Sequence, residues 1–186
     1  MPETGLARDE SIRATTTAEA LAGLRPAFRP EGGTVTAGNA SPLSDGAAAL
    51  LLADERGLRA TGRDPLARIS ASAVTGIEPQ LFGLGPVEAV RRALERAGRG
   101  LADLAVVELN EAFAAQALGC LAQWPGLDPE VVNPRGGAIA LGHPLGASGA
   151  RLAGAVAHQL AARGGGTGLA ALCIGVGQGL ALTLEH

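Results

Sequence analysis

Short aliphatic runs alternate with amphipathic segments from residue 67 to the end of the chain. Their lengths and their β-branched residues predict strands at 67–77, 104–109, 168–174 and 180–184. Helical periodicity, with proline or glycine at the boundaries, predicts helices at 85–97, 112–123 and 148–163. Because strands and helices alternate, we expect an α/β protein whose mixed sheet carries helices on its faces.

The first third of the chain has a weaker pattern. Residues 1–33 are rich in Pro, Arg and Thr, predict only a short helix at 17–24 and have no core of their own. Residues 47–53 form a continuous small-apolar run, which is typical of a buried strand or helix. Residues 54–61 predict a short helix that ends at Gly62.

Composition narrows the class of protein. Aromatic residues make up only 2% of the 186 residues, so the core must be built from Ala, Leu, Val and Ile, which suits close-packed α/β layers. The net charge of −3 and the scattered arginines argue against nucleic-acid binding. Two cysteines, no long apolar run and no apolar leader predict a cytoplasmic protein without disulfides or a membrane helix.

Three segments carry the side chains that are candidates for chemistry. They are NEAF at 110–113, NPRGGAIALGHP at 133–144 and CIGVGQG at 173–179. Each follows a predicted strand or precedes a predicted helix, and ligands in open α/β sheets bind at such ends. We therefore expect the three segments to converge on one pocket.

Each candidate side chain also has a simpler interpretation. His143 could donate to an oxyanion or take a proton from a thiol, or it could be a loop histidine that bonds a backbone carbonyl. Cys173 could become a working thiolate, or be a buried structural cysteine. Asn110 could bond a carbonyl or a water molecule, or cap the following helix. Cys120, mid-helix among apolar residues, is interpreted as core.

Other kinds of site are not favoured. The glycines at 175, 177 and 179 are not followed by the helix that a dinucleotide-binding loop requires. The histidines and cysteines lack the close spacing of a zinc site, and His158 is expected at the surface of a helix. No G-x-S-x-G elbow of a serine hydrolase occurs.

Four motifs together resemble the thiolase family. NPRGGAIALGHPLGASGAR at 133–151 resembles the thiolase signature, and CIGVGQG at 173–179 resembles the C-terminal active-site segment. NEAF at 110–113 is similar to a third family motif, and GTVTAGNASPLSDGAAA at 33–49 to the segment that closes the pantetheine tunnel. Their order and spacing agree with the family.

The resemblance implies an α/β thiolase fold. Residues 67–186 would form the C-terminal domain, with a mixed five-stranded sheet flanked by helices. Residues 41–66 would be a remnant of the N-terminal domain, and residues 1–40 the tail of the loop and N-terminal region. Since residues 41–66 would lack most of their packing partners, their apolar surface should be exposed and favour self-association.

The resemblance also implies thiolytic cleavage or Claisen condensation of 3-ketoacyl-CoA, with coenzyme A thioesters as substrates and neither cofactor nor metal. His143 would activate a nucleophilic cysteine, and Asn110 would hold a water molecule in the first oxyanion hole. Cys173 would move the proton at the α-carbon, and the N–H of Gly175 would serve the second oxyanion hole. The residues implied in binding coenzyme A are Ser41, Phe113, Phe82 and Phe28.

The nucleophilic cysteine of the family lies far upstream, and the only cysteines here are Cys120 and Cys173. We therefore expect acyl-CoA and CoA as partners, together with further copies of the chain or an N-terminal thiolase half, and neither nucleic acid nor a membrane. The alternative is a non-catalytic module that binds CoA esters or pairs with a thiolase. The segment CIGVGQG resembles that of degradative thiolases, including those acting on 3-oxoadipyl-CoA.

Overall fold

The computed structural model describes residue 5 and residues 7–186, which divide into two compact units, Met1–Gly38 and Asn39–His186. The first unit contains α1 (Ala18–Ala22), none of whose residues is buried. The hydroxyl of Thr17 caps this helix by accepting a hydrogen bond from the N–H of Ala20 at 3.1 Å. The short helix predicted at 17–24 is confirmed, and the described residues of this unit contribute nothing to the buried core.

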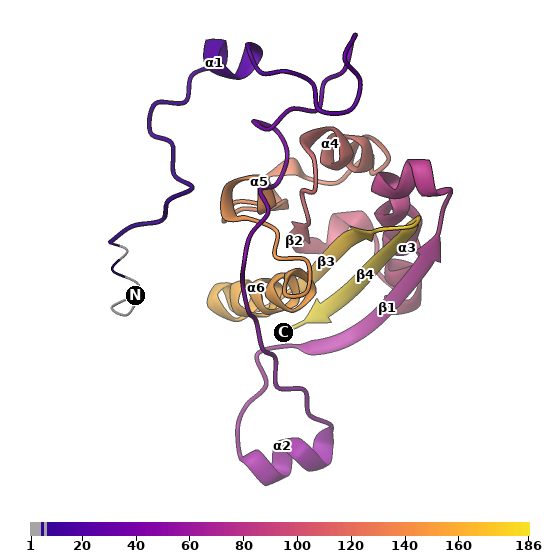
Figure 1. Ribbon diagram of the computed structural model, residues 1–186. Helices are drawn as coiled ribbons and strands as arrows, with labels where there is room; N and C mark the ends of the chain where they lie inside the picture. Colours follow the sequence, from indigo (N-terminus) through magenta and orange to yellow (C-terminus); the bar gives the residue numbers. More distant parts are fainter. Residues whose placement is uncertain (1–4, 6) are drawn as a thin grey trace. The chain divides into compact units, whose positions relative to one another are not determined.

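The second unit is built on a mixed sheet (Figure 1). Its strands are β1 (Arg68–Gly76), β2 (Leu104–Leu109), β3 (Thr167–Ile174) and β4 (Gln178–Glu185). They lie in the order β1-β4-β3-β2, and only the β2–β3 pair is parallel. All four strands predicted from periodicity are therefore present, within one or two residues of their expected bounds.

Helices cover both faces of this sheet. The longer ones are α3 (Gly85–Ala97), α4 (Ala114–Ala122) and α6 (Ser148–Arg163). The second unit also contains the short helices α2 (Glu55–Thr61), which lies away from the sheet in Figure 1, and α5 (Ala138–Leu141), together with the 3-10 turns η1 (Pro79–Leu84), η2 (Leu101–Asp103) and η3 (Pro129–Val131). In the described part of the chain, no helix combines the length and the apolar composition needed to cross a membrane.

Side-chain alternation along the strands divides the core into two clusters. Val107 and Leu109 of β2 pack with α3 and α4 on one face, whereas Val106 packs with α6 on the other. The α6 cluster rests on Leu152, Val156 and Leu160, which are at most 1% exposed. The α6 helix is therefore fixed by the sheet along its length, and its first turn lies beside the carboxyl end of β2.

The expectation of a five-stranded sheet was wrong, since the described residues form four strands. Beyond β2, the chain makes only an isolated parallel bridge between Val107 and Val132. The next residue, Asn133, has a φ of 46°, which leaves the extended conformation, and Pro134 has no N–H to donate. The pairing therefore ends before a fifth strand can form.

The expectation that residues 47–53 form a buried strand or helix was also wrong. They have no regular structure, and Leu51 and Leu52 are 81% and 70% exposed. The exposure expected for apolar side chains within 41–66 is confirmed, because an apolar run becomes ordered only when another surface covers it. The neighbouring helix α2 forms as predicted, with Asp54 capping its start and Gly62 in a left-handed conformation at its end.

Replacing Leu160 with alanine should lower the free energy of unfolding by about 2–5 kcal/mol, because the side chain is fully enclosed between α6 and the sheet. The matched control is Leu51→Ala, which removes an exposed leucine and should change stability by less than about 0.5 kcal/mol. Urea denaturation of both variants measures the difference. Equal losses would contradict the burial of Leu160 or the exposure of Leu51.

Candidate active site

The carboxyl ends of β2 and β3 meet at one edge of the sheet. Leu109 is paired with Ala171, and the N–H of Asn110 donates to the carbonyl of Ala171 at 2.9 Å. Asn110 therefore follows β2 at the same edge where Cys173 follows Ala171 on β3. Ligands bind at such an end in open α/β sheets, and the three motif segments were expected to converge there.

His143 lies in the loop between α5 and α6, and both of its ring nitrogens contact side chains. The Ser148 hydroxyl donates to the carbonyl of Pro144 at 3.0 Å, so it accepts a hydrogen bond from Nδ1 of His143 at 2.6 Å. That pairing places the single proton of the neutral ring on Nδ1. Nε2 then presents a lone pair, 3.2 Å from Nδ2 of Asn110. The alternative in which His143 bonds a backbone carbonyl was wrong, because both ring nitrogens contact side chains instead.

Burial, followed by the positive charge of Arg151, lowers the pKa of His143 below its ordinary value. An imidazole with an ordinary pKa of about 6.5 is already mostly neutral at pH 7, and a lowered pKa makes it more so. His143 therefore presents a neutral Nε2 that can accept a proton.

Asn110 connects this histidine to the sheet. The residue is fully buried, and its Nδ2 contacts His143 while its Oδ1 has no hydrogen-bonding partner among the described residues. The helix-cap alternative for Asn110 was wrong, because α4 begins after Phe113 and Gln116 accepts the N–H of Ala112 at 3.1 Å. The Oδ1 atom can accept one further hydrogen bond in the interior of the site.

The glycine-rich segment 133–144 is fastened to the end of β2 by two side chains. The Asn133 amide bonds both backbone groups of Leu109, accepting its N–H at 2.8 Å and donating to its carbonyl at 2.9 Å. Glu111 accepts hydrogen bonds from Asn133 at 3.0 Å and from the N–H of Ile139 at 3.2 Å. A Cβ on Gly137 would lie 2.0 Å from the Glu111 carboxyl carbon, so a side chain there would displace this carboxylate from its present position.

Cys173 is the penultimate residue of β3, is 8% exposed, and has a pKa that burial raises above the ordinary thiol value. It is therefore a protonated thiol at neutral pH, which agrees with the alternative of a buried cysteine rather than that of a resting thiolate. Gly175, just beyond it, is exposed, and open space lies where a Cβ would project. Its backbone is accessible to a ligand.

The turn that follows Cys173 is strained. Val176 has a φ of 61°, which is rare for a β-branched residue, and its side chain is 82% exposed. Gly177 fixes the turn, because its carbonyl accepts the N–H of Ile77 at 2.8 Å and a Cβ there would lie 2.1 Å from the Ile77 carbonyl.

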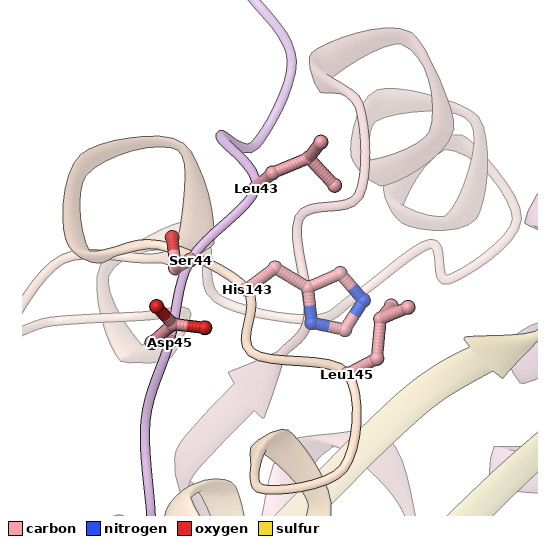
Figure 2. A pocket seen from close by; sticks show the side chains of 5 residues that line it. All are labelled: Leu43, Ser44, Asp45, His143 and Leu145. Carbon is pink, nitrogen blue, oxygen red and sulfur yellow. The ribbon is translucent and has the colours of Figure 1, made fainter.

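A cavity of about 450 Å³ opens beside His143 (Figure 2). It is lined by Leu43, Ser44, Asp45, His143 and Leu145. The extended segment 39–45 forms part of this wall because Ser41 is fixed nearby, with its N–H and hydroxyl both donating to the carbonyl of Ala112 at 3.1 and 3.2 Å. The cavity gives a ligand direct access to the histidine.

The remaining residues predicted from the sequence are distributed between the two units. Phe113 is half-buried and bridges to Ala40, and Phe82 is half-buried in η1, so both belong to the unit that contains His143. Phe28 belongs to the first unit and is 73% exposed. Cys120 is fully buried with a pKa raised by burial to about 11, which confirms it as core, and His158 is exposed as predicted.

Across the described residues, no group of three or more His, Cys, Asp or Glu side chains is placed to hold a metal ion. The groups at this edge of the sheet are instead the imidazole of His143, the amide of Asn110, the thiol of Cys173 and backbone groups, and of these side chains His143 lines the cavity. Such a set can transfer protons and stabilise an oxyanion.

Comparison with known proteins agrees with this geometry. Residues 63–186 match the family model described as thiolase, C-terminal domain, and residues 2–56 match that described as thiolase, N-terminal domain. The chain belongs to the thiolase family. The resemblance inferred from the four motifs is therefore confirmed.

Individual thiolases are similar along nearly the whole chain. The 3-oxoadipyl-CoA/3-oxo-5,6-dehydrosuberyl-CoA thiolase of Escherichia coli (strain K12) is 58% identical over 98% of this chain and 46% of its own length. The acetyl-CoA acetyltransferase of the same strain is 54% identical over 96% of this chain and 45% of its own length. This chain thus spans about half the length of the curated relatives it matches.

Solved thiolase structures confirm the predicted fold. The acetyl-CoA acetyltransferase of Bacillus anthracis superposes with a TM-score of 0.89 at 48% identity, covering 96% of this chain and 45% of its own. Human mitochondrial 3-ketoacyl-CoA thiolase in complex with CoA gives a TM-score of 0.86 at 43% identity, covering 95% of this chain and 44% of its own.

Sequence reasoning missed three side chains that hold this site in place. Ser148 fixes the ring of His143, Glu111 braces the segment 133–139, and Arg151 has two guanidinium nitrogens buried near the histidine. In a sequence, a serine and an arginine on the first turn of a helix after a reactive histidine indicate only weakly that they position the histidine. The structure is needed to show that they lie near it.

Asn133→Ala should destabilise the protein by at least about 2 kcal/mol, because it leaves both backbone groups of Leu109 and one oxygen of Glu111 without their partner. Arg135→Ala, an exposed change two residues away, is the control and should stay within about 0.5 kcal/mol. Thermal or urea unfolding compares them. Similar stability of the two variants would show that the Asn133 amide does not brace β2.

Both cysteines should react slowly with iodoacetamide in the folded chain at pH 8. Burial raises the pKa of each thiol, and a thiol whose pKa is higher by one holds about tenfold less of the reactive thiolate at this pH. Unfolding in urea, or raising the pH above about 9, should increase the rates, with each site followed by mass spectrometry. Rapid alkylation of Cys173 in the native chain at pH 8 would contradict this assignment.

Proposed function

We propose that this chain supplies the C-terminal half of a thiolase active site, which cleaves or forms 3-ketoacyl-CoA together with an N-terminal half that carries the nucleophilic cysteine. The observation that carries this proposal is the neutral His143 held between Ser148 and Asn110, at the same sheet edge as Cys173. The family membership supports the reaction class.

His143 acts as the base that activates the nucleophile. Its Nε2 lone pair accepts the thiol proton, and the thiolate attacks the 3-keto carbon of the substrate. The buried Oδ1 of Asn110, which has no partner among the described residues, accepts a hydrogen from the water that completes the first oxyanion hole. Ser148 keeps the imidazole in the tautomer that this step requires.

Cys173 acts as the acid in the cleavage direction. When the bond between the α-carbon and the keto carbon breaks, its electron pair remains on the α-carbon of the departing thioester. The Cys173 thiol then donates its proton to that carbon, and the raised pKa keeps this proton in place beforehand. The exposed N–H of Gly175 donates to the thioester oxygen during this step. A protonated resting thiol thus favours thiolysis.

The substrates are acyl-CoA esters and CoA. Ser41, Phe113 and Phe82, which belong to the second unit, contact the pantetheine arm in this proposal. The name of a relative, 3-oxoadipyl-CoA thiolase, supports a degradative role, and a cytoplasmic location is part of the same proposal. Residues 67–186 then form the C-terminal domain, 41–66 a remnant of the N-terminal domain and 1–40 the preceding loop region. The exposed leucines of 50–52 support association with an N-terminal half or with further copies of the chain.

Mixing this chain with the N-terminal half of the Escherichia coli relative that is 58% identical should produce thiolysis of acetoacetyl-CoA. The reaction is measured as the loss of the enolate absorbance. The chain alone should show no turnover. His143→Ala or Cys173→Ser in the mixture should lower the rate by about 10²–10⁴-fold, because each removes a proton-transfer group.

The matched control is Cys120→Ser, which alters a core thiol that takes no part in the proposed chemistry. It should retain most of the activity of the mixture. Turnover by the chain alone would mean that one of its own cysteines is the nucleophile. An inactive mixture that still binds CoA esters would favour the non-catalytic module instead.

A further inference from the structure

We propose that Arg151 is a positioning residue for His143, supplying a fixed positive charge that holds the imidazole in its neutral, proton-accepting form. The inference deepens the role given to His143 in the proposed function, on which its catalytic meaning rests. The protonation of the ring itself can be measured without any turnover.

Arg151 lies on the first turn of α6, three residues after Ser148, so the two side chains project from the same side of the helix. Ser148 bonds the ring of His143 directly at 2.6 Å. Nε and Nη2 of Arg151 are enclosed by protein and have no hydrogen-bonding partner among the described residues. A guanidinium that is neither solvated nor paired at these atoms keeps a weakly screened positive field.

The contacts around the resting ring favour its neutral form. Nδ1 donates a hydrogen bond to the Ser148 hydroxyl. Nε2 faces Nδ2 of Asn110, an amide nitrogen that can only donate. While the amide keeps this orientation, a proton on Nε2 would point at a donor, so the resting ring is held neutral. The positive end of the α6 dipole, close to the same loop, also disfavours an imidazolium ion.

Electrostatics act in the same direction. Burial comes first in lowering the pKa of His143, and the charge of Arg151 lowers it further. Arg151 therefore opposes protonation of the ring at a site that already disfavours it.

Among the acidic and titratable groups on the neighbouring elements, Glu108 of β2 lies within reach of the Arg151 charge. Burial raises the pKa of Glu108, whereas a hydrogen bond from Gln159 at 2.7 Å and the charge of Arg151 lower it. Arg151 therefore acts on both Glu108 and His143, and its charge still lowers the pKa of His143. Glu111 is occupied by Asn133 and Ile139. Asp45 is exposed to solvent, which screens it, and Cys173 on β3 carries a protonated thiol.

The test is an NMR pH titration of the imidazole Hε1 signals in the purified chain, which has three histidines. In the wild type, His143 should titrate below the ordinary value of about 6.5. Arg151→Gln, which removes the charge, should move that midpoint upward, whereas Arg151→Lys, which keeps the charge, should leave it low. Arg163→Gln, at the other end of α6, should not move it, and the signals of His158 and His186 report any general change.

An Arg151→Gln variant that is folded by circular dichroism but titrates like the wild type would overturn the proposal. Equal upward movements of the midpoint in Arg151→Gln and Arg151→Lys would overturn it as well, because the effect would then follow the shape of the side chain. If Arg151→Gln does not fold, the wild type and Arg151→Lys decide, since a wild-type midpoint at or above about 6.5 contradicts the proposal without any variant.

A second arm separates this inference from the proposed function. In the mixture with an N-terminal half, the acid limb of the pH profile of kcat/KM should move to higher pH in Arg151→Gln, because more of His143 is protonated at a given low pH. A raised NMR midpoint in a mixture without activity would leave the inference standing and would count against the proposed function alone. A raised midpoint with an unmoved acid limb would show that His143 is not the titrating base.

Discussion

The parallel pairing of β2 and β3 is the interaction on which the rest of the second unit depends. Parallel strands end at the same edge, so this pairing brings Asn110 and Cys173 to one side of the sheet although they lie far apart in the sequence. It also places β2 where alternate side chains reach two separate cores. A slip of one residue in this register would turn Val107 and Leu109 away from α3 and α4, and would displace Asn110 from His143.

The α6 helix converts this sheet edge into a site. Its buried face, Leu152, Val156 and Leu160, is fixed against β2 and β3, so its first turn has a defined position. That first turn presents Ser148 to the imidazole and Arg151 beside it. The loop that carries His143 is therefore held from two sides, by α6 and by the Asn110 amide that follows β2. Packing of leucine and valine thus sets the position of a proton acceptor that none of these residues contacts.

The elements of the sheet could be predicted from the sequence because periodicity records local structure. The runs at 104–109 and 168–174 gave β2 and β3 almost to the residue. The predictions that failed depended on partners distant in the sequence. Residues 47–53 are apolar, yet they are neither regular nor buried, because helix or strand periodicity does not say whether another surface covers the segment. The contacts of Asn133 and Glu111 likewise join segments more than 20 residues apart, and local pattern carries no information about such pairs.

Burial acts on His143 and Cys173 in opposite directions and leaves both uncharged. A base loses affinity for its proton when it is enclosed, so His143 is neutral, whereas an acid holds its proton more tightly, so Cys173 is a thiol. A low-dielectric pocket can therefore hold one proton acceptor and one proton donor at the same pH without an ion pair between them. This pairing suits a reaction that begins by taking a proton and ends by giving one back. Arg151 reinforces only the first of these tendencies, because its charge opposes an imidazolium, whereas the protonated state of Cys173 rests on burial.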